Sequence, residues 1–400
     1  MKQFLILLFS WLTLQLSAQP VFKTPGREGH PYRIPAIATT GKSSLLAVSD
    51  FRWCGSDIGY GHIDLVGRLS SDGGRTWGTE FPIATGSGVK GADDCGYGDA
   101  ALCADMSSDR VVMLCATGNV VYFQSTREHP IRVARLYSED GGKTWSRPED
   151  ITRMIYDLVP KAKGLFVGSG KICQSRVVKV GRYARLYAAL ATMAGNYVIY
   201  SDDFGQHWAL LGDAVSPAPA GDEPKCEELP DGTVILSSRK EGGRWFNLFR
   251  FTDVRKADGH WMTAAASDRV PDGLTVGNNA CNGEILLVPV VRKSDNQSCW
   301  LLLQSIPLGP LSQGDENRSN VSIYYKEVTA STVDSPAALA AGWTLGRIFR
   351  SPQGAYSTMS LPMADGTIPF LYETAPGQYS VVYERVSIGE LTHGSYEAVK

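Results

Sequence analysis

Short apolar segments, each followed by a glycine-rich turn, recur along most of the chain. Residues 63–69 (IDLVGRL), 131–137 (IRVARLY) and 197–200 (YVIY) are rich in β-branched, aromatic and other apolar side chains, as strands are. Apolar positions with helical spacing over helical lengths are nearly absent. The pattern therefore predicts many short strands joined by hairpin turns, with one short helix in the alanine-rich stretch 335–342.

The turns after these three segments share one motif, S-x-D-x-G-x-T-W. Its copies start at Ser70, Ser138 and Ser201, the third being diverged, and a fainter copy runs from Thr252 to Trp261. An Asp in a tight turn accepts hydrogen bonds from the backbone, Gly permits a positive φ, and Trp packs the turn onto its sheet. We therefore interpret these boxes as markers of the fold and assign them no catalytic role.

The copies lie about 65 residues apart, which is enough chain for a four-stranded antiparallel sheet and its loops. About 380 residues follow the N-terminal segment, enough for six such units. No Pro/Gly-rich linker or shift in composition divides this region. The sequence thus predicts an all-β fold, a six-bladed β-propeller of four-stranded antiparallel blades over residues 19–400.

The N-terminal residues are typical of a secretory signal peptide. Lys2 precedes an apolar run at positions 4–16, and Ser17 and Ala18 follow it. A membrane-spanning helix needs about 20 apolar residues, more than this run provides. We expect cleavage after Ala18, export to the periplasm or the medium, and no stable membrane anchor.

Composition narrows the function further. The chain has 43% hydrophobic residues, as globular proteins do, and 39 Lys and Arg balance 41 Asp and Glu for a net charge of −2. No overall positive field therefore attracts nucleic acid or an anionic membrane. The eight Cys include no C-x-x-C pair, which argues against zinc, and both free thiols and one or two disulfides fit the expected export.

A second set of motifs resembles the bacterial-type exo-α-sialidase (neuraminidase) family, with Asp boxes, similar to glycoside hydrolase family 33. The resemblance spans nearly the whole exported chain. Its motifs are R-I-P at 33–35, D-F-R at 50–52 followed by Asp57, E-P at 223–224 with E-L-P-D-G at 228–232 and Arg239, A-Y-S at 355–357, and L-Y-E at 371–373.

This resemblance implies an arginine clamp for the carboxylate that sialic acid carries on its anomeric carbon. Arg33 is assigned by its R-I-P motif and Arg239 by its sixteen-residue spacing from Glu223. Arg318 is assigned by its place before a strand-like segment, with Arg292 and Arg347 as alternatives. Arginine suits the role because it is always charged and binds carboxylates through two hydrogen bonds.

The resemblance also implies the catalytic groups. Tyr356 is the expected nucleophile, because a neutral phenol avoids the repulsion that a carboxylate would meet at this anomeric centre, and sialidases are the tyrosine exception among glycosidases. A phenol with a pKa near 10 needs a base, which we assign to Glu223, with Glu227 and Glu228 as alternatives one register away. Asp57 is the expected acid and base, with Asp64 as its rival.

Arg52 and Asp99 resemble residues that lie near O4 of the sugar. Together the assignments predict a retaining exo-α-sialidase that acts on sialylated glycans as a monomer, without a metal or other cofactor. A trans-sialidase, including an intramolecular one, and a non-catalytic lectin remain as alternatives. Residues 304–320 and 328–342 are expected to set the linkage preference.

Overall fold

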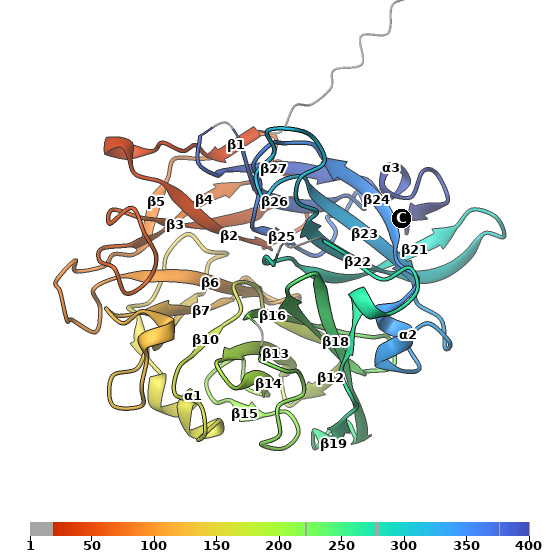
Figure 1. Ribbon diagram of the computed structural model, residues 1–400, viewed down its shortest axis with the longest axis horizontal. Helices are drawn as coiled ribbons and strands as arrows, with labels where there is room; N and C mark the ends of the chain where they lie inside the picture. Colours follow the sequence, from red (N-terminus) through yellow and green to blue (C-terminus); the bar gives the residue numbers. More distant parts are fainter. Residues whose placement is uncertain (1–18, 221, 277–279, 376, 400) are drawn as a thin grey trace, which may run out of the picture.

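Strands joined by tight turns account for almost all regular structure in the computed structural model of the protein, which describes residues 19–220, 222–276, 280–375 and 377–399. The predicted signal peptide, residues 1–18, lies outside the described residues. Six sheets follow one another around a central axis, and in Figure 1 their colours run from red at the upper left, through green at the bottom, to blue at the upper right. The predicted six-bladed β-propeller is confirmed.

The first three sheets comprise the following strands. Sheet 1 contains β2 (Tyr32–Thr39), β3 (Leu45–Phe51), β4 (Asp64–Ser70) and β5 (Phe81–Ala84). Sheet 2 contains β6 (Tyr97–Ala104), β7 (Val111–Thr117), β8 (Arg132–Ser138), β9 (Glu149–Asp150) and β11 (Gly170–Lys171). Sheet 3 contains β10 (Leu165–Val167), β12 (Cys173–Val180), β13 (Tyr183–Thr192), β14 (Gly195–Ser201) and β15 (Ala209–Leu210).

The other three sheets complete the ring. Sheet 4 contains β16 (Asp222–Glu228), β17 (Val234–Lys240), β18 (Gly243–Asp253), β19 (Asp258–Trp261) and β20 (Ala265–Ala266). Sheet 5 contains β21 (Ile285–Arg292), β22 (Gln297–Pro307), β23 (Val321–Glu327), β24 (Thr344–Phe349) and β28 (Tyr396–Ala398). Sheet 6 contains β25 (Ser357–Met359), β26 (Ile368–Thr374), β27 (Ser380–Val386) and β1 (Gln19–Phe22).

Helices are few and short, as the missing helical periodicity indicates. They are α1 (Thr152–Leu158), α2 (Pro336–Ala340), α3 (Ile388–Leu391) and the 3-10 turns η1 (Arg27–Gly29), η2 (Tyr122–Gln124) and η3 (Ser267–Arg269). The helix α2 lies in the predicted alanine-rich stretch and begins where Ser335 accepts a hydrogen bond from the Ala338 backbone N–H. Within the described residues, no helix is long and apolar enough to cross a membrane.

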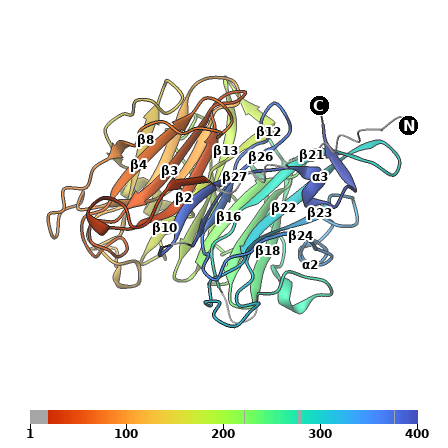
Figure 2. The same ribbon diagram turned by 90° about the horizontal axis from the view of Figure 1, so that it is seen from above.

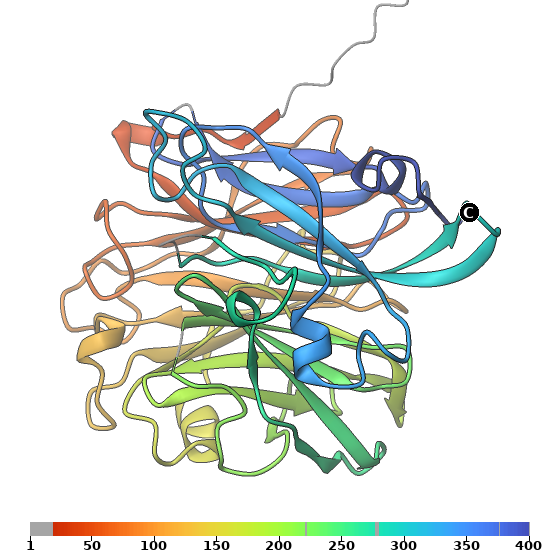
Figure 3. The same ribbon diagram turned by 45° about the vertical axis from the view of Figure 1, so that its right-hand side comes forward.

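The first and last strands of the described residues are built into the sheets. The first strand, β1, pairs antiparallel with β27, so sheet 6 combines the first described strand with strands from residues 357–386. In Figure 2, β26 and β27 of this sheet lie between β2 and β24 of its neighbours. The C-terminal strand β28 pairs with β21, whose hairpin with β22 projects from the body in Figure 3. Four sheets thus carry a fifth strand beyond the predicted four.

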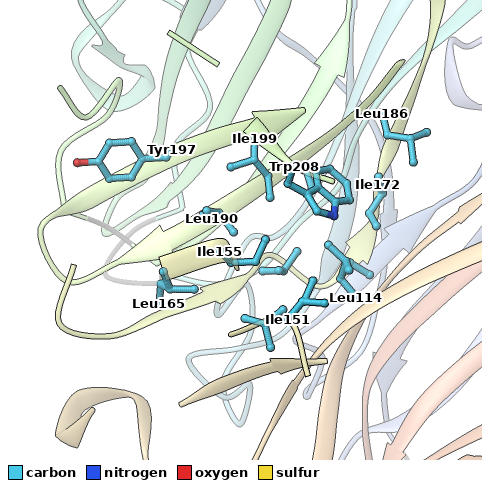
Figure 4. Close-up of a cluster of buried hydrophobic side chains, with 14 of the residues drawn as sticks. Leu114, Ile151, Ile155, Leu165, Ile172, Leu186, Leu190, Tyr197, Ile199 and Trp208 are labelled. Carbon is cyan, nitrogen blue, oxygen red and sulfur yellow. The ribbon is translucent and has the colours of Figure 1, made fainter. Parts of the chain in front are cut away.

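The hydrophobic core is divided among the sheet interfaces. Six clusters of buried apolar side chains fill the spaces between neighbouring sheets, one at each interface. Figure 4 shows the cluster in which Leu114 of β7 packs with Ile199 of β14 and with Trp208, the tryptophan of the third box. All eight cysteines fall within the described ranges and are free thiols, five of them at these interfaces, so the free-thiol alternative holds in this structure.

The S-x-D-x-G-x-T-W boxes form hairpin turns, as predicted, and they join β4 to β5, β8 to β9 and β14 to β15. In the first box, Thr76 donates to Asp72 from its backbone N–H (2.9 Å) and its hydroxyl (2.6 Å), and the Gly74 N–H donates to Ser70 Oγ at 2.8 Å. Gly74 has a φ of 80°, and a Cβ there would lie 2.0 Å from the Tyr383 ring of the neighbouring sheet. Glycine is therefore required for the box to close on that sheet.

The other boxes repeat this geometry. The second box makes the same bonds at the same lengths through Asp140 and Thr144. In the third, His207 occupies the threonine position and its Nδ1 lies 2.6 Å from Asp203 Oδ2. The backbone N–H of Gly73 donates to Ser43 in the β2–β3 turn, so the boxes lie at one end of the blades.

Candidate active site

The functional side chains gather at the end of the blades opposite to the boxes, where three innermost strands are irregular. The strand pairing shifts register between Arg33 and Ala36 in β2, between Gly98 and Ala101 in β6, and beside Asp222 in β16. Ile34 and Asp99 have φ values of 53° and 57°, which is uncommon for Asp and rare for a β-branched residue. Bulges of this kind re-aim side chains, and here they turn charged groups toward the central axis.

One pocket at this end contains every residue that the sequence assigned to the site. Its cavity volume is about 350 Å³. The predicted residues that line it are Arg33, Arg52, Asp57, Asp99, Glu223, Arg239, Arg318 and Tyr356. They come from all sheets except the third, so positions more than 300 residues apart in the sequence share one cavity.

The centre of the pocket is the pair of Tyr356 and Glu223. The Tyr356 hydroxyl donates a short hydrogen bond to Glu223 Oε1, and Arg239 Nη1 lies 2.6 Å from Oε2 of the same carboxylate. Tyr356 precedes β25 and Glu223 lies at the start of β16, so the two strands aim the side chains at each other across the axis. Burial, helped by the Glu223 charge, raises the pKa of Tyr356 well above 10, which keeps the phenol protonated.

A buried carboxylate fixes the first arginine. Glu373 of β26 accepts from Arg33 Nε at 2.8 Å and Nη2 at 3.2 Å, and from the backbone N–H groups of Ile34 (2.9 Å) and Tyr356 (3.1 Å). Burial alone would lower the pKa of Arg33, but the Glu373 carboxylate raises it and holds the charge in place. Glu373 therefore positions both the strained R-I-P bulge and the backbone of Tyr356.

The third arginine differs from the other two. Arg33 and Arg239 each pair with a carboxylate, whereas Arg318 has no carboxylate partner among the described residues. Its pKa is raised, chiefly by the neighbouring Cys281 thiol. A half-buried cation without a partner favours an anionic ligand in this pocket.

The structure also separates Arg318 from its two rivals. Arg292 pairs with Glu327 and Asp295 on the far side of sheet 5. Arg347 pairs with Glu384 at 2.7 Å, and neither residue lines the pocket. Of the three arginines considered, only Arg318 is placed where it can contact a ligand in the cavity.

A carboxylate cluster surrounds Arg52 on one wall. Arg52 Nη2 lies 3.0 Å from Asp50 Oδ2 and 3.0 Å from Asp57 Oδ1, and the Asp99 N–H donates to Asp50 Oδ1 at 3.0 Å. Burial and the charges of Asp57 and Asp50 raise the pKa of Asp99 well above 3.8. One guanidinium thus pairs with two carboxyl groups, and burial also raises the pKa of one of them, Asp50, to about 7.

Asp57 is the most accessible acid of this cluster. Its side chain is 59% exposed, while that of Arg52 is 5% exposed. The Ile58 backbone N–H donates to Asp57 Oδ1 at 2.8 Å and fixes the carboxyl orientation. Asp57 is therefore held at the mouth of the pocket, where it can reach both a bound ligand and water.

The alternative acids lie elsewhere. Asp64 accepts from Trp53 Nε1 and the Gly86 N–H in sheet 1 and does not line the pocket. Glu227 and Glu228 continue β16 away from the cavity, where Glu227 pairs with Lys171 and Glu228 accepts from Ser175. These three carboxylates thus form hydrogen bonds or ion pairs outside the pocket.

Several lining residues were not assigned from the sequence. They are Ile34, Ile58, Tyr60, Val121, Tyr122, Phe123, Ile131, Phe166 and Asp222. Asp222 adds a second carboxylate beside Arg239, 3.2 Å from its Nη1, and the apolar side chains form a wall next to Asp57. Asp222 is adjacent to the E-P motif, which is the one signal that could have found it. Among the described residues, no group of three or more His, Cys, Asp and Glu side chains could hold a metal ion.

One further expectation is corrected by the fold. Residues 328–342 were expected to border the site, but they join the ends of β23 and β24 that point away from it, where Lys326 Nζ caps the end of α2. None of them lines the pocket. The segment 304–320 does reach the cavity, through Arg318.

Comparisons with known proteins agree with this geometry. The BNR/Asp-box repeat family model matches residues 136–147, which contain the second box. The chain is 28% identical over 365 residues to a sialidase of Micromonospora viridifaciens, covering 88% of this chain and 51% of that protein. It is 30% identical over 224 residues to a sialidase of Bacteroides fragilis, covering 53% of this chain and 40% of that protein. The chain is a relative of the bacterial sialidases.

The chain spans about half the length, or less, of these two relatives. Among solved structures it is similar to the intramolecular trans-sialidase of Ruminococcus gnavus, with a TM-score of 0.68 and 16% identity over 90% of this chain and 95% of that one. That likeness supports the propeller fold. The resemblance inferred from the sequence motifs is confirmed.

Proposed function

We propose that this protein is a retaining exo-α-sialidase, which removes terminal sialic acid from glycoproteins, glycolipids or oligosaccharides. The observation that carries the proposal is the hydrogen bond from Tyr356 to Glu223 in a pocket that also contains Arg33, Arg239 and Arg318. The similarity to bacterial sialidases supports the same activity.

The arginines account for the choice of substrate. Sialic acid has its carboxylate on the anomeric carbon, so three guanidinium groups beside a nucleophile place that carbon within reach of it. Among the residues that the structure describes, Arg318 pairs with no carboxylate, and Arg239 Nε is buried without a partner. A bound carboxylate would supply both partners.

In the first step, the Tyr356 oxygen attacks the anomeric carbon and its proton passes to Glu223. The neutral phenol approaches an anionic substrate without repulsion, and the existing hydrogen bond provides the proton path. Asp57 donates its proton to the glycosidic oxygen as the bond to the leaving sugar breaks. A sialyl-tyrosine remains.

In the second step, Asp57 takes a proton from a water molecule whose oxygen attacks the anomeric carbon from the face that the leaving sugar has vacated. The bond to Tyr356 breaks, and Glu223 returns the proton to the phenol oxygen. Two inversions give net retention. The nucleophile, the base and the acid of both steps are side chains of this chain. We propose that the protein acts in the periplasm or the medium after export.

A proton NMR time course with purified protein and sialyllactose tests the proposal. We expect the α-anomer of free sialic acid to appear first and the β-anomer to follow by mutarotation. An anhydro sugar or a transferred sialyl group would make the protein a trans-sialidase with the same residues. Saturable binding with no product would contradict the enzyme and favour a lectin.

A further inference from the structure

Two aromatic side chains stand out at the mouth of the pocket because they are exposed. Within the part of the chain that the structure describes, Tyr60 (60% exposed) and Phe123 (74% exposed) are the exposed aromatic residues, and both line the pocket. The other aromatic residues described are buried or half-buried. Exposed aromatic surface is unfavourable in water, so its confinement to one cavity mouth indicates a binding surface.

Tyr60 belongs to the same loop as the predicted acid. Its backbone N–H donates to the Asp57 carbonyl at 3.1 Å, which closes the turn between the two residues. A group that protonates the glycosidic oxygen lies next to the leaving sugar. Tyr60 is therefore on the side of the pocket from which that sugar departs.

Phe123 lies on η2 and is supported from behind. Its ring makes an edge contact with Tyr122 at a centroid distance of 4.9 Å, and Tyr122 makes a second one with Phe166 at 4.8 Å. Phe166 is buried at the wall of the pocket. These two edge contacts hold the exposed Phe123 ring in place without covering it.

The two aromatic segments are also fixed to each other. Asn119 Nδ2 donates to the Gly59 carbonyl at 3.1 Å. Gly59 has a φ of 97°, and a Cβ there would lie 2.3 Å from the Val121 backbone nitrogen. The loop of Tyr60 thus contacts the segment of Phe123 so closely that only glycine fits.

We propose that Tyr60 and Phe123 form a binding platform for the sugar that follows sialic acid in the substrate. The faces of a pyranose ring expose C–H groups, which carry a partial positive charge and bind the electron-rich faces of aromatic rings while burying apolar surface. The proposal rests on the sialidase function above. Tyr60 and Phe123 would then select among glycans that share the same terminal sialic acid.

Kinetics with two substrates test the platform. The ratio of kcat/KM for 3′-sialyllactose to that for the methyl α-glycoside of sialic acid isolates the contribution of the following sugars. In Tyr60→Ala and Phe123→Ala this ratio should fall about tenfold each, and Tyr60→Phe should retain it because the ring is kept. Val215→Ala, which removes an exposed apolar side chain outside the pocket, should leave the ratio unchanged.

Saturation-transfer NMR gives a readout that does not require turnover. In a Tyr356→Phe background, the lactose protons of sialyllactose should receive saturation, and adding Tyr60→Ala and Phe123→Ala should remove these signals while the sialic acid signals persist. Equal loss for both parts of the ligand, or an unchanged substrate ratio, would overturn the platform and leave the sialidase function standing. No binding and no turnover by the wild type would overturn both.

Discussion

The pKa of aspartate shifts in opposite directions at the two ends of the blades. At the box end, hydrogen bonds from Thr76 and Thr144 lower the pKa of Asp72 and of Asp140 to about 2. At the pocket end, burial and neighbouring carboxylates raise the pKa of Asp99. The carboxylates of the boxes are stabilised by the fold, whereas that of Asp99 is destabilised by it.

This difference separates stability from function along each blade. At the box end, Asp72, Asp140 and Asp203 accept hydrogen bonds from within their own boxes, so these carboxylates require no ligand. The pocket end leaves Arg318 without a carboxylate among the described residues and holds Ile34 at a strained φ of 53°. Sites that bind charged transition states commonly retain such strain and unpaired charge, which the rest of the fold must offset.

The largest expected effect comes from the pocket end. Tyr356→Phe removes the nucleophile oxygen but keeps the ring, so turnover of sialyllactose should fall about 1,000-fold or more while the protein unfolds at nearly the wild-type temperature. Initial rates and a thermal melt on the same preparation measure both. Activity within about tenfold of wild type would show that another group is the nucleophile.

Asp57→Ala should separate acid catalysis from the rest of the site. Loss of the proton donor should slow hydrolysis of sialyllactose about 100-fold or more, and should slow an aryl sialoside with a good leaving group much less. The matched control is Asp93→Ala, which removes another exposed carboxylate that pairs with an arginine outside the pocket. Equal losses on both substrates would contradict the assignment of Asp57 as the acid.

Glu373→Gln should impair both stability and activity, because one buried carboxylate holds Arg33 and the backbone of Tyr356. A neutral amide leaves the Arg33 charge uncompensated, at a cost of about 3 kcal/mol. The free energy of unfolding and the KM for sialyllactose report the two effects. Glu384→Gln is the control, because Glu384 lies on β27, next to β26, and pairs with Arg347 outside the pocket. This variant should leave KM unchanged.

The box end should show the smallest effect, on stability alone. Asp140→Ala removes the acceptor for Thr144 and should cost about 1 kcal/mol without changing kcat. Because the folded-state pKa of Asp140 is lowered from 3.8 to about 2, its contribution is present above pH 4 and is lost as the pH falls toward 2. Melts of wild type and variant between pH 7 and pH 2 should converge at the acid end, and a constant difference would contradict this origin.

The sequence predicted the fold well because the boxes are local. Ser, Asp, Gly and Trp act within eight residues of one another, so their pattern shows each hairpin directly. The number of blades then followed from the spacing of the copies. The added strands such as β11 and β28 could not be predicted, because two or three residues pair there only after the sheets have assembled.

The site residues were predicted from short motifs, and this explains which parts of the site the prediction missed. The R-I-P, D-F-R, E-P and A-Y-S motifs each contain a side chain that lines the pocket, but they do not show which distant residue it contacts. Glu373 was visible in the L-Y-E motif, yet its bonds to Arg33 and Tyr356 span 340 and 17 positions. Tyr60 and Phe123 belong to no motif, and their exposure becomes visible only once the loops are placed.

Trapping the covalent intermediate tests the central claim, that Tyr356 is the nucleophile, most directly. A sialosyl fluoride with a second fluorine at C3 should react with the protein and hydrolyse slowly, because the added fluorine destabilises the positive charge that develops at the anomeric carbon. Peptide mass spectrometry should then find one sialyl group on the peptide that contains Tyr356, and none in Tyr356→Phe. A sialyl group on Asp57 or Glu223, or no adduct in an active preparation, would contradict the account.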